Sequence, residues 1–249
     1  MTAYSSLAAW YDELTRDVPY TAFADYYEGL FRARGGETGL ILDLCCGTGS
    51  LACLMAARGY DVIAADASAD MLMSAREKAS ALGVGKMPLF INQSAQELDL
   101  YGTVDAAVCA LDSLNHITDE TALEAAIGRV ALFTAPGGVF VFDVNTPYKH
   151  REILGQNTFV YDLGDLYCVW QNATDDTLLT EITLDFFVRE KTLYAREGES
   201  FCERGYSHDT LAGILDRAGF ELLAVYAGDT FDPVGETTQR AVYVARRRG

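Results

Sequence analysis

The stretch Leu40-Ile41-Leu42-Asp43-Leu44-Cys45-Cys46-Gly47-Thr48-Gly49-Ser50 decides the fold expected for this chain of 249 residues. Its apolar first half predicts a buried strand, and a helix is expected to begin at Ser50. Glycines at such a turn let a ligand approach the backbone, and the helix start offers free N–H groups. Gly47 to Ala52 also fits the dinucleotide pattern GxGxxG/A, and a glycine turn can be purely structural, so the ligand class stays open here.

Strands and helices alternate along the chain around this stretch. Further strands are expected at 60–65, 87–91, 104–109 and 139–144, after a turn at Pro136-Gly137-Gly138, and helices at 50–58, 68–82 and 119–134. Nearly continuous apolar strands that alternate with helices predict a parallel sheet covered on both faces. Right-handed crossovers then bring the carboxyl ends of these strands to one edge of the sheet.

The two remaining parts of the chain have different patterns. Residues 1–37 predict two helices, and residues 158–206 contain period-two alternation, as at Ile182, Leu184 and Phe186. A helix and two strands follow Ser207. We therefore expect an α/β fold: a seven-stranded, mostly parallel Rossmann-like sheet with helices on both faces, plus a small antiparallel β insertion. The expected domains are an N-terminal helical lid (1–37), a ligand-binding domain (38–145 and 207–249) and a substrate-side flap (146–206).

Composition restricts the class of partner. The formal net charge is -17, and no basic stripe precedes the terminal run Arg246-Arg247-Arg248. The chain is therefore predicted to bind neither nucleic acid nor an anionic membrane surface. No signal peptide or membrane-spanning run is recognisable, which predicts a cytoplasmic protein. Six cysteines without a CxxC pair and only three histidines predict reduced thiols and no metal site.

Asp66 narrows the ligand class. It ends the expected second strand, Val62-Ile63-Ala64-Ala65-Asp66, so its carboxylate is expected at the same sheet edge as the glycine turn. An acid at this position accepts hydrogen bonds from ribose hydroxyls. Ser68 is available to cap the next helix, which leaves Asp66 for the ligand.

Four motifs together resemble those of class I S-adenosylmethionine-dependent methyltransferases. Asp43 to Gly49 resembles their first motif, and Ala65 to Ser68, followed by Met71-Leu72 and Ala75-Arg76, resembles the second. Val104 to Val108 resembles the strand before their substrate-facing loop, and Pro136 to Phe140 the turn into their fifth strand. The similarity spans about 38–145 and returns at 208–246. Tyr4 to Asp12 is also similar to the aromatic start of small-molecule members, and 146–206 to an insertion in a bacterial subgroup. Cys45 is a departure, because the family usually has glycine there.

The resemblance implies S-adenosylmethionine as cofactor and S-adenosylhomocysteine as product. In the family, an acid at the position of Asp43 supports the amino end of the donor, often through water, and dinucleotide enzymes normally lack it. The residues implied in cofactor binding are Asp43, Cys45, Cys46, Gly47, Thr48, Gly49, Asp66, Ala67, Met71, Gln93, Ser94, Ala95, Ala110 and Leu111. Candidates for contact with the acceptor are Tyr11, Tyr20, Asn115 and Asn145.

His116 is the candidate general base, because imidazole titrates near neutrality. It has an equally simple alternative role in shaping the pocket. A base is needed only where the acceptor must lose a proton. The predicted function is methyl transfer to a small-molecule acceptor without a metal. An NAD(P)-dependent oxidoreductase and a non-catalytic S-adenosylmethionine-binding module are the alternatives, and both the acceptor atom and the oligomeric state, monomer or homodimer, stay open.

Overall fold

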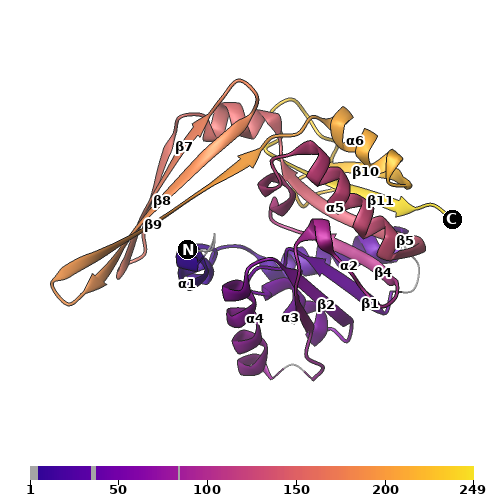
Figure 1. Ribbon diagram of the computed structural model, residues 1–249, viewed down its shortest axis with the longest axis horizontal. Coiled ribbons are helices and arrows are strands. Elements are labelled where there is room, and N and C mark those ends of the chain that lie inside the picture. The colour runs from indigo at the N-terminus through magenta and orange to yellow at the C-terminus, as the bar shows by residue number, and fades with distance from the viewer. Residues whose placement is uncertain (1–4, 35–37, 84) are drawn as a thin grey trace.

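The computed structural model describes residues 5–34, 38–83 and 85–249, and Tyr4 lies outside them. Figure 1 shows a main body and a second, smaller sheet that extends from it. The body holds a seven-stranded sheet in the order β10-β11-β5-β4-β1-β2-β3. Its strands are β1 (Leu40–Leu44), β2 (Asp61–Asp66), β3 (Leu89–Asn92), β4 (Val104–Cys109), β5 (Thr134–Asn145), β10 (Phe220–Ala227) and β11 (Arg240–Arg247). β1 to β5 are mutually parallel, and β11 runs antiparallel to β5 and β10. This confirms the expected sheet.

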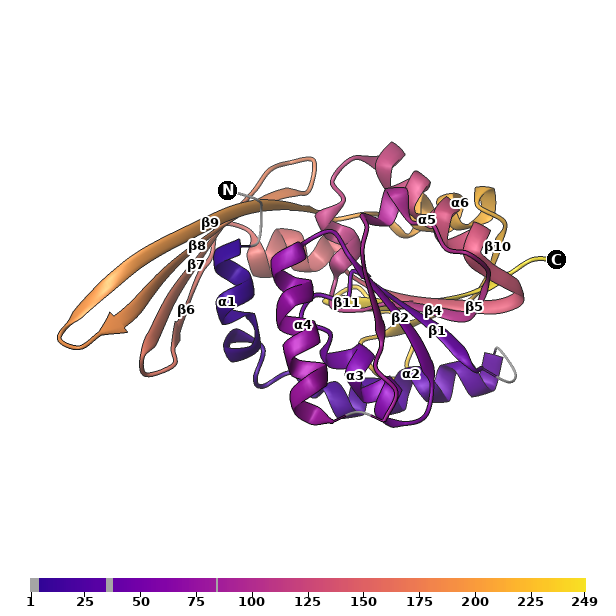
Figure 2. The same cartoon turned by 60° about the horizontal axis from the view of Figure 1, so that its bottom comes forward.

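Helices cover both faces of this sheet, as Figure 2 shows. On one face lie α2 (Tyr20–Arg34), α3 (Ser50–Ala57) and α4 (Ala69–Leu82), and on the other α5 (Glu120–Phe133) and α6 (His208–Arg217). Tyr27, Leu30 and Phe31 of α2 are almost fully buried in the first core. The second helix of the expected N-terminal lid is thus a layer of the main body, and only α1 (Ser5–Leu14) packs against the smaller sheet, through Leu7 and Ala8.

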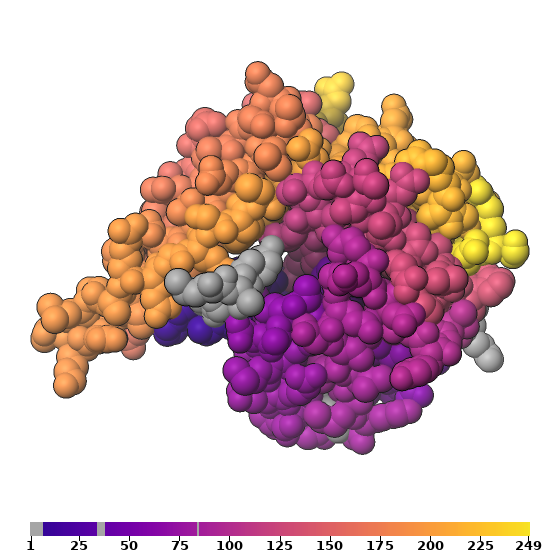
Figure 3. Space-filling view, viewed as in Figure 1, coloured from indigo at the N-terminus to yellow at the C-terminus, as the bar shows by residue number. Residues whose placement is uncertain are grey.

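The inserted segment forms an antiparallel sheet in the order β6-β7-β8-β9. Its strands are β6 (Thr158–Asp162), β7 (Leu166–Thr174), β8 (Leu179–Glu190) and β9 (Leu193–Arg204), and a π-helix, η3 (Lys149–Leu154), leads into it. The space-filling view shows this sheet as an arm, with a hollow where the arm meets the body (Figure 3). The buried face of the arm carries Ile182, Leu184 and Phe186, which confirms the period-two prediction.

The expected turn before the fifth strand differs in form. Thr134 pairs with Val104 and Val139 with Ala106, so residues 135–138 bulge out within one continuous β5. Gly137 takes a positive φ of 83° there, a conformation that favours glycine. None of the helices in the described ranges is both long and apolar enough to cross a bilayer.

Gly49 packs too closely against neighbouring elements for any side chain. It has φ +71°, and an added Cβ would lie 2.9 Å from the Cβ of Ala75 and 3.1 Å from Cε1 of Phe90. We expect Gly49→Ala to lower the free energy of unfolding by about 1–3 kcal/mol, from strain and overpacking. Urea denaturation measures this. Gly29→Ala is the matched control, because nothing lies within 4 Å of that Cβ position in α2. Equal midpoints for Gly49→Ala and the wild type would contradict the prediction.

Candidate active site

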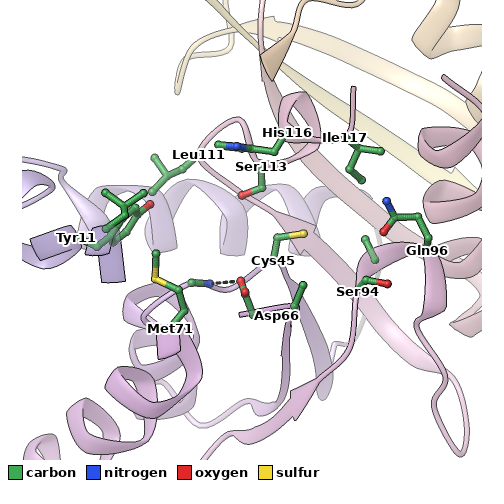
Figure 4. A pocket seen from close by; sticks show the side chains of 14 residues that line it. Tyr11, Cys45, Asp66, Met71, Ser94, Gln96, Leu111, Ser113, His116 and Ile117 are labelled. Atoms are coloured by element: carbon green, nitrogen blue, oxygen red, sulfur yellow. Dashed lines mark hydrogen bonds between the residues drawn. The ribbon is translucent and has the colours of Figure 1, made fainter. Parts of the chain in front are cut away.

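A cavity of about 340 Å³ opens at the carboxyl edge of the parallel strands. Figure 4 shows side chains from α1, the ends of β1 and β2, and the turns after β3 and β4 surrounding it. It is lined by Leu7, Tyr11, Cys45, Gly47, Asp66, Ala67, Met71, Ser94, Ala95, Gln96, Leu111, Ser113, His116 and Ile117. Two short 3₁₀ turns, η1 (Ala95–Glu97) and η2 (Ser113–His116), contribute one wall each.

Asp66 holds the glycine turn while facing this cavity. Its Oδ2 accepts a hydrogen bond of 2.8 Å from the backbone N–H of Gly47, drawn as a dashed line in Figure 4. Its Oδ1 accepts one of 2.8 Å from the backbone N–H of Ser68. Burial raises the pKa of Asp66, while these two N–H groups oppose that shift. Because Ser68 itself caps α4 by accepting from the N–H of Met71, Asp66 is not needed as the helix cap.

Asp43 closes a much smaller cavity at the other side of the glycine turn. This cavity, of about 30 Å³, is lined by Tyr11, Tyr20, Asp43, Cys45, Cys46, Gly47, Thr48, Ser50, Leu51, Ala110, Leu111 and Ser113. Its volume is about that of one water molecule. Asp43 is only 3% exposed, and its Oδ2 has no hydrogen-bond partner among the residues that the structure describes. Burial and the nearby Asp66 raise the pKa of Asp43 to about 7. A cationic ligand group would give Oδ2 of Asp43 a hydrogen-bond partner, either directly or through a water molecule.

The raised pKa of Asp43 predicts that binding of a ligand with an ammonium group at this site depends on pH. Below about pH 7 the empty protein holds Asp43 protonated, so an ammonium group must displace that proton to pair with the carboxylate. We expect the affinity for S-adenosylhomocysteine to rise about tenfold from pH 5.5 to 7.5. Isothermal titration calorimetry measures it, with Asp43→Asn as the variant that should show no such dependence. An equal slope in both proteins would contradict the assignment.

The free protein should show the opposite trend. The folded-state pKa of Asp43 lies above its ordinary value of 3.8, so between these values the folded state binds more protons than the unfolded state. The contribution of Asp43 to stability is therefore present at low pH and declines as the pH rises towards 7. The buried Asp143, whose pKa is also raised to about 7, adds to this decline.

A second cavity, of about 220 Å³, adjoins the first and shares Leu7, Tyr11, Leu111 and His116 with it. The arm supplies Tyr161, Trp170, Leu184, Phe201 and Glu203 to its wall. A third cavity, of about 210 Å³, shares Asp112, Tyr161, Trp170 and Glu203 with the second and reaches Asn145 and Lys149. Three connected spaces thus run from the glycine turn to the underside of the arm.

His116 lies between the first and second cavities. Its Nε2 is 3.6 Å from Oε1 of Glu203, and its ring packs against Phe201 with 5.1 Å between ring centroids. Burial lowers the pKa of His116, which keeps the imidazole neutral and able to accept a proton at neutral pH. Ligand atoms of Asp112, His116 and Glu203 lie within 4.8 Å of one another, so this cluster has a donor set that a divalent metal can use.

Salt bridges and hydrogen bonds hold α1 over these cavities. Lys78 of α4 donates to Oδ1 of Asp12 at 2.7 Å and to the hydroxyls of Thr48 and Ser50 at 2.9 and 2.6 Å. The Thr48 hydroxyl also donates to Asp12 at 2.6 Å. Because Thr48 belongs to the glycine turn, this network couples the position of α1 to the binding loop itself.

Most of the residues expected to bind a ligand lie together at these cavities. Among the cofactor candidates, the first cavity and the small cavity beside Asp43 are lined by Asp43, Cys45, Cys46, Gly47, Thr48, Asp66, Ala67, Met71, Ser94, Ala95, Ala110 and Leu111. Of the acceptor candidates, Tyr11, Tyr20 and Asn145 each line at least one cavity. Their roles toward cofactor and acceptor remain predictions.

Three candidates lie elsewhere. Gly49 packs against α4, and the side-chain amide of Gln93 bonds the backbone of Asp99. Asn115 is fully buried and does not line the described cavities. Its side-chain amide hydrogen-bonds to the backbone N–H and carbonyl of Asn145 and to the carbonyl of Arg204. Asn115 therefore connects β5 to the arm and does not face an acceptor.

Asp112 and Glu203 are two further site residues, of which only Glu203 has no indication in the sequence. Asp112 follows β4 in a left-handed conformation, φ 51°, which turns the chain into η2. A signal for it exists, since it directly follows Ala110 and Leu111, both cofactor candidates. Glu203 has no comparable signal, because β9 also carries the exposed Arg196 and Glu197 and the 3% exposure of Glu203 depends on how the arm docks.

Comparison with known proteins gives the family. A model of the methyltransferase domain matches residues 41–138. YqeM of Bacillus subtilis (strain 168), whose name places it among the methyltransferases, is 30% identical over 246 residues, which are 98% of this chain and 97% of that protein. A solved S-adenosylmethionine-dependent methyltransferase from Clostridium acetobutylicum ATCC 824 is 30% identical, with TM-score 0.89 over 99% of both chains. A glycine/sarcosine N-methyltransferase of Halorhodospira halochloris is 27% identical over 54% of this chain and 49% of that protein. The chain belongs to the class I S-adenosylmethionine-dependent methyltransferases.

Proposed function

We propose that this enzyme transfers the methyl group of S-adenosylmethionine to a small organic acceptor bound in the second cavity. The observation that carries the proposal is the shared wall of the first two cavities, made by Leu7, Tyr11, Leu111 and His116. A donor lying from Ser94 to Asp43, past Asp66, would present its methyl group at this wall. The volume beyond it, about 220 Å³, suits a small molecule.

Methyl transfer is an in-line displacement at a carbon already activated by the positive sulfonium. The protein has to align the nucleophile, the methyl carbon and the sulfur, and such alignment supplies about 7–11 kcal/mol of the barrier. Asp66 is placed to accept from the ribose hydroxyls, Ser94 and Ala95 to border the adenine, and Asp43 to support the amino end. His116 is placed to take a proton from the acceptor.

Exclusion of water is the role proposed for α1 and the arm. Tyr11 of α1 lines the first cavity, the small cavity beside Asp43 and the second cavity, which is the proposed acceptor space. The Lys78 network and a 2.8 Å hydrogen bond from the N–H of Leu7 to Glu199 fix α1 between the body and the arm. Cofactor entry therefore requires α1 to move, as expected of a lid.

Two alternatives have less support. A nicotinamide-dependent oxidoreductase would share Asp66, but family membership and the acid at Asp43 favour the sulfonium donor. A binding module without catalysis would need no acceptor space, whereas the second cavity adjoins the donor cavity and the third adjoins the second. The name of the Halorhodospira halochloris relative states small acceptors for that protein, which supports the size class proposed here.

The decisive test is turnover of a metabolite panel with donor labelled in its methyl group. We expect label to reach a small organic product, with S-adenosylhomocysteine formed in equal amount. The control is the same panel with Asp66→Ala protein. Binding of NAD(P) but not of S-adenosylmethionine in calorimetry would overturn the proposal, and tight donor binding without turnover of any acceptor would favour the binding module.

A further inference from the structure

The acid pair at the junction of the second and third cavities does not line the first cavity, where the cofactor is proposed to bind. Asp112 and Glu203 line both cavities, and Glu203 is 3% exposed although it sits in the arm. The amide nitrogen of Asn145 donates to Oδ2 of Asp112 at 2.7 Å and to Oε2 of Glu203 at 3.3 Å. One donor thus holds two carboxylates side by side, and each carboxylate keeps a second oxygen for a ligand.

Acidic groups outnumber basic groups around this pair. Lys149 is a cation that acts on Glu203, and its ammonium donates to Oδ1 of Asn145 at 2.8 Å. His116, 3.6 Å from Glu203, is held neutral by burial, which lowers its pKa. Two acidic side chains therefore face one ammonium across Asn145. Ionising both of them at this site is costly unless a cation joins them.

Aromatic side chains form the rest of the wall. Tyr161, Trp170 and Phe201 line the second cavity, and Tyr161 and Trp170 continue into the third. Carboxylates combined with aromatic faces are a recognised chemistry for organic cations, since the ring quadrupole attracts positive charge and the rings pack on the carbon skeleton. A bare metal ion would use the carboxylates and His116 but gain nothing from these rings.

Resting on the proposed function, we infer that Asp112 and Glu203 bind the acceptor as an ammonium ion. The acceptor is then a primary or secondary amine on a carbon skeleton that extends into the third cavity. A carboxylate beside the nitrogen would be repelled by the same pair, so glycine and sarcosine are not acceptors of this enzyme. This separates it from the N-methyltransferase of Halorhodospira halochloris, to which about half of the chain is similar.

The same pair accounts for the proton that an amine must lose. The ammonium R–NH3⁺ gives a proton either to the Glu203 carboxylate or to the imidazole of His116. This leaves R–NH2 with a free electron pair. That pair attacks the methyl carbon, the carbon–sulfur bond breaks with its electrons staying on sulfur, and R–NH2⁺–CH3 and S-adenosylhomocysteine result. Burial and the charge of Asp112 raise the pKa of Glu203 to about 8, which brings it nearer to that of an alkylammonium, about 10.4, and so lowers the cost of the proton transfer.

The test measures binding to the complex with S-adenosylhomocysteine, so that it does not depend on turnover. Probes are benzylamine, cyclohexylamine and butylamine, each paired with the alcohol of the same skeleton, together with glycine and sarcosine. We expect at least one amine to bind about tenfold or more tightly than its alcohol, and glycine and sarcosine to bind no better than the alcohols. Glu203→Gln should remove most of this preference while the affinity for S-adenosylhomocysteine stays unchanged. Glu197→Gln removes the same charge from an exposed position on β9 and is the control.

Proton release distinguishes a direct role of Glu203 from a structural one. At pH 7, binding of an ammonium should expel the proton from Glu203, so calorimetric heats should differ between buffers of different ionisation enthalpy, and Glu203→Gln should abolish that difference. Equal binding of amines and alcohols would overturn the inference while leaving methyl transfer intact. So would cobalt(II) binding with d–d absorption bands that vanish in Glu203→Gln and that amines do not displace, since the cluster would then be a metal site. Loss of S-adenosylhomocysteine binding in the wild type would instead contradict the proposed function.

Discussion

Asp66→Ala is expected to raise the dissociation constant for S-adenosylmethionine about a hundredfold or more. A hydrogen bond to a charged group contributes about 1.5–3 kcal/mol, and we propose that this carboxylate accepts from both ribose hydroxyls. The substitution also removes the acceptor for the N–H groups of Gly47 and Ser68, each 2.8 Å away, so the glycine turn loses its support. Calorimetric titration of wild type and variant measures the effect.

Two further variants separate these contributions. Asp66→Asn keeps one acceptor oxygen without the charge and should lie between the wild type and Asp66→Ala. Glu77→Ala removes an acid from the exposed side of α4 and should leave affinity unchanged. A dissociation constant for Asp66→Ala close to that of the wild type, in a protein that unfolds normally, would mean that the donor does not lie along the end of β2.

The sequence predicts the body of the fold because its signals are local. Apolar strands between helices, the glycine turn and the acid after β2 depend only on neighbouring residues, and the same edge geometry brings Asp43 and Asp66 together. The bulge in β5 was expected as a turn before the strand. Pro136, Gly137 and Gly138 are equally compatible with a turn and with a bulge inside a strand. Only the strand pairing of Thr134 and Val139 shows that the strand continues past it.

The acceptor side is much less predictable, because it forms where distant segments meet. Asn115 looks like a pocket residue from its place after β4, yet it bonds the backbone of Asn145 and Arg204, 30 and 89 positions away. Glu203 resembles its exposed neighbours on β9 until the arm docks over η2. Burial of a polar side chain depends on tertiary structure. A single-sequence pattern therefore cannot tell that Asn115 bonds the backbone while Glu203 lines a cavity.

His116→Asn is expected to lower kcat by about 10²–10⁴-fold and to leave the affinity for S-adenosylmethionine unchanged. Asparagine retains a polar group of similar reach but cannot take up a proton near neutrality. Because burial lowers the pKa of His116, the wild-type imidazole is in its basic form at pH 7, and the acid limb of the kcat/KM profile should fall below the ordinary histidine value of 6.5. Single-turnover kinetics with the acceptor identified in the labelled screen measure both effects.

The alternative role of His116 in shaping the pocket predicts a different result. A shape effect would appear mainly in KM and would keep the acid limb of the profile, whereas loss of the base lowers kcat and removes that limb. In His116→Ala, added imidazole should restore part of kcat, because the ring space between Phe201 and Glu203 is then empty. Unchanged turnover in His116→Asn would remove His116 from the mechanism and leave Glu203, on the same cavity wall, as the group that accepts the proton.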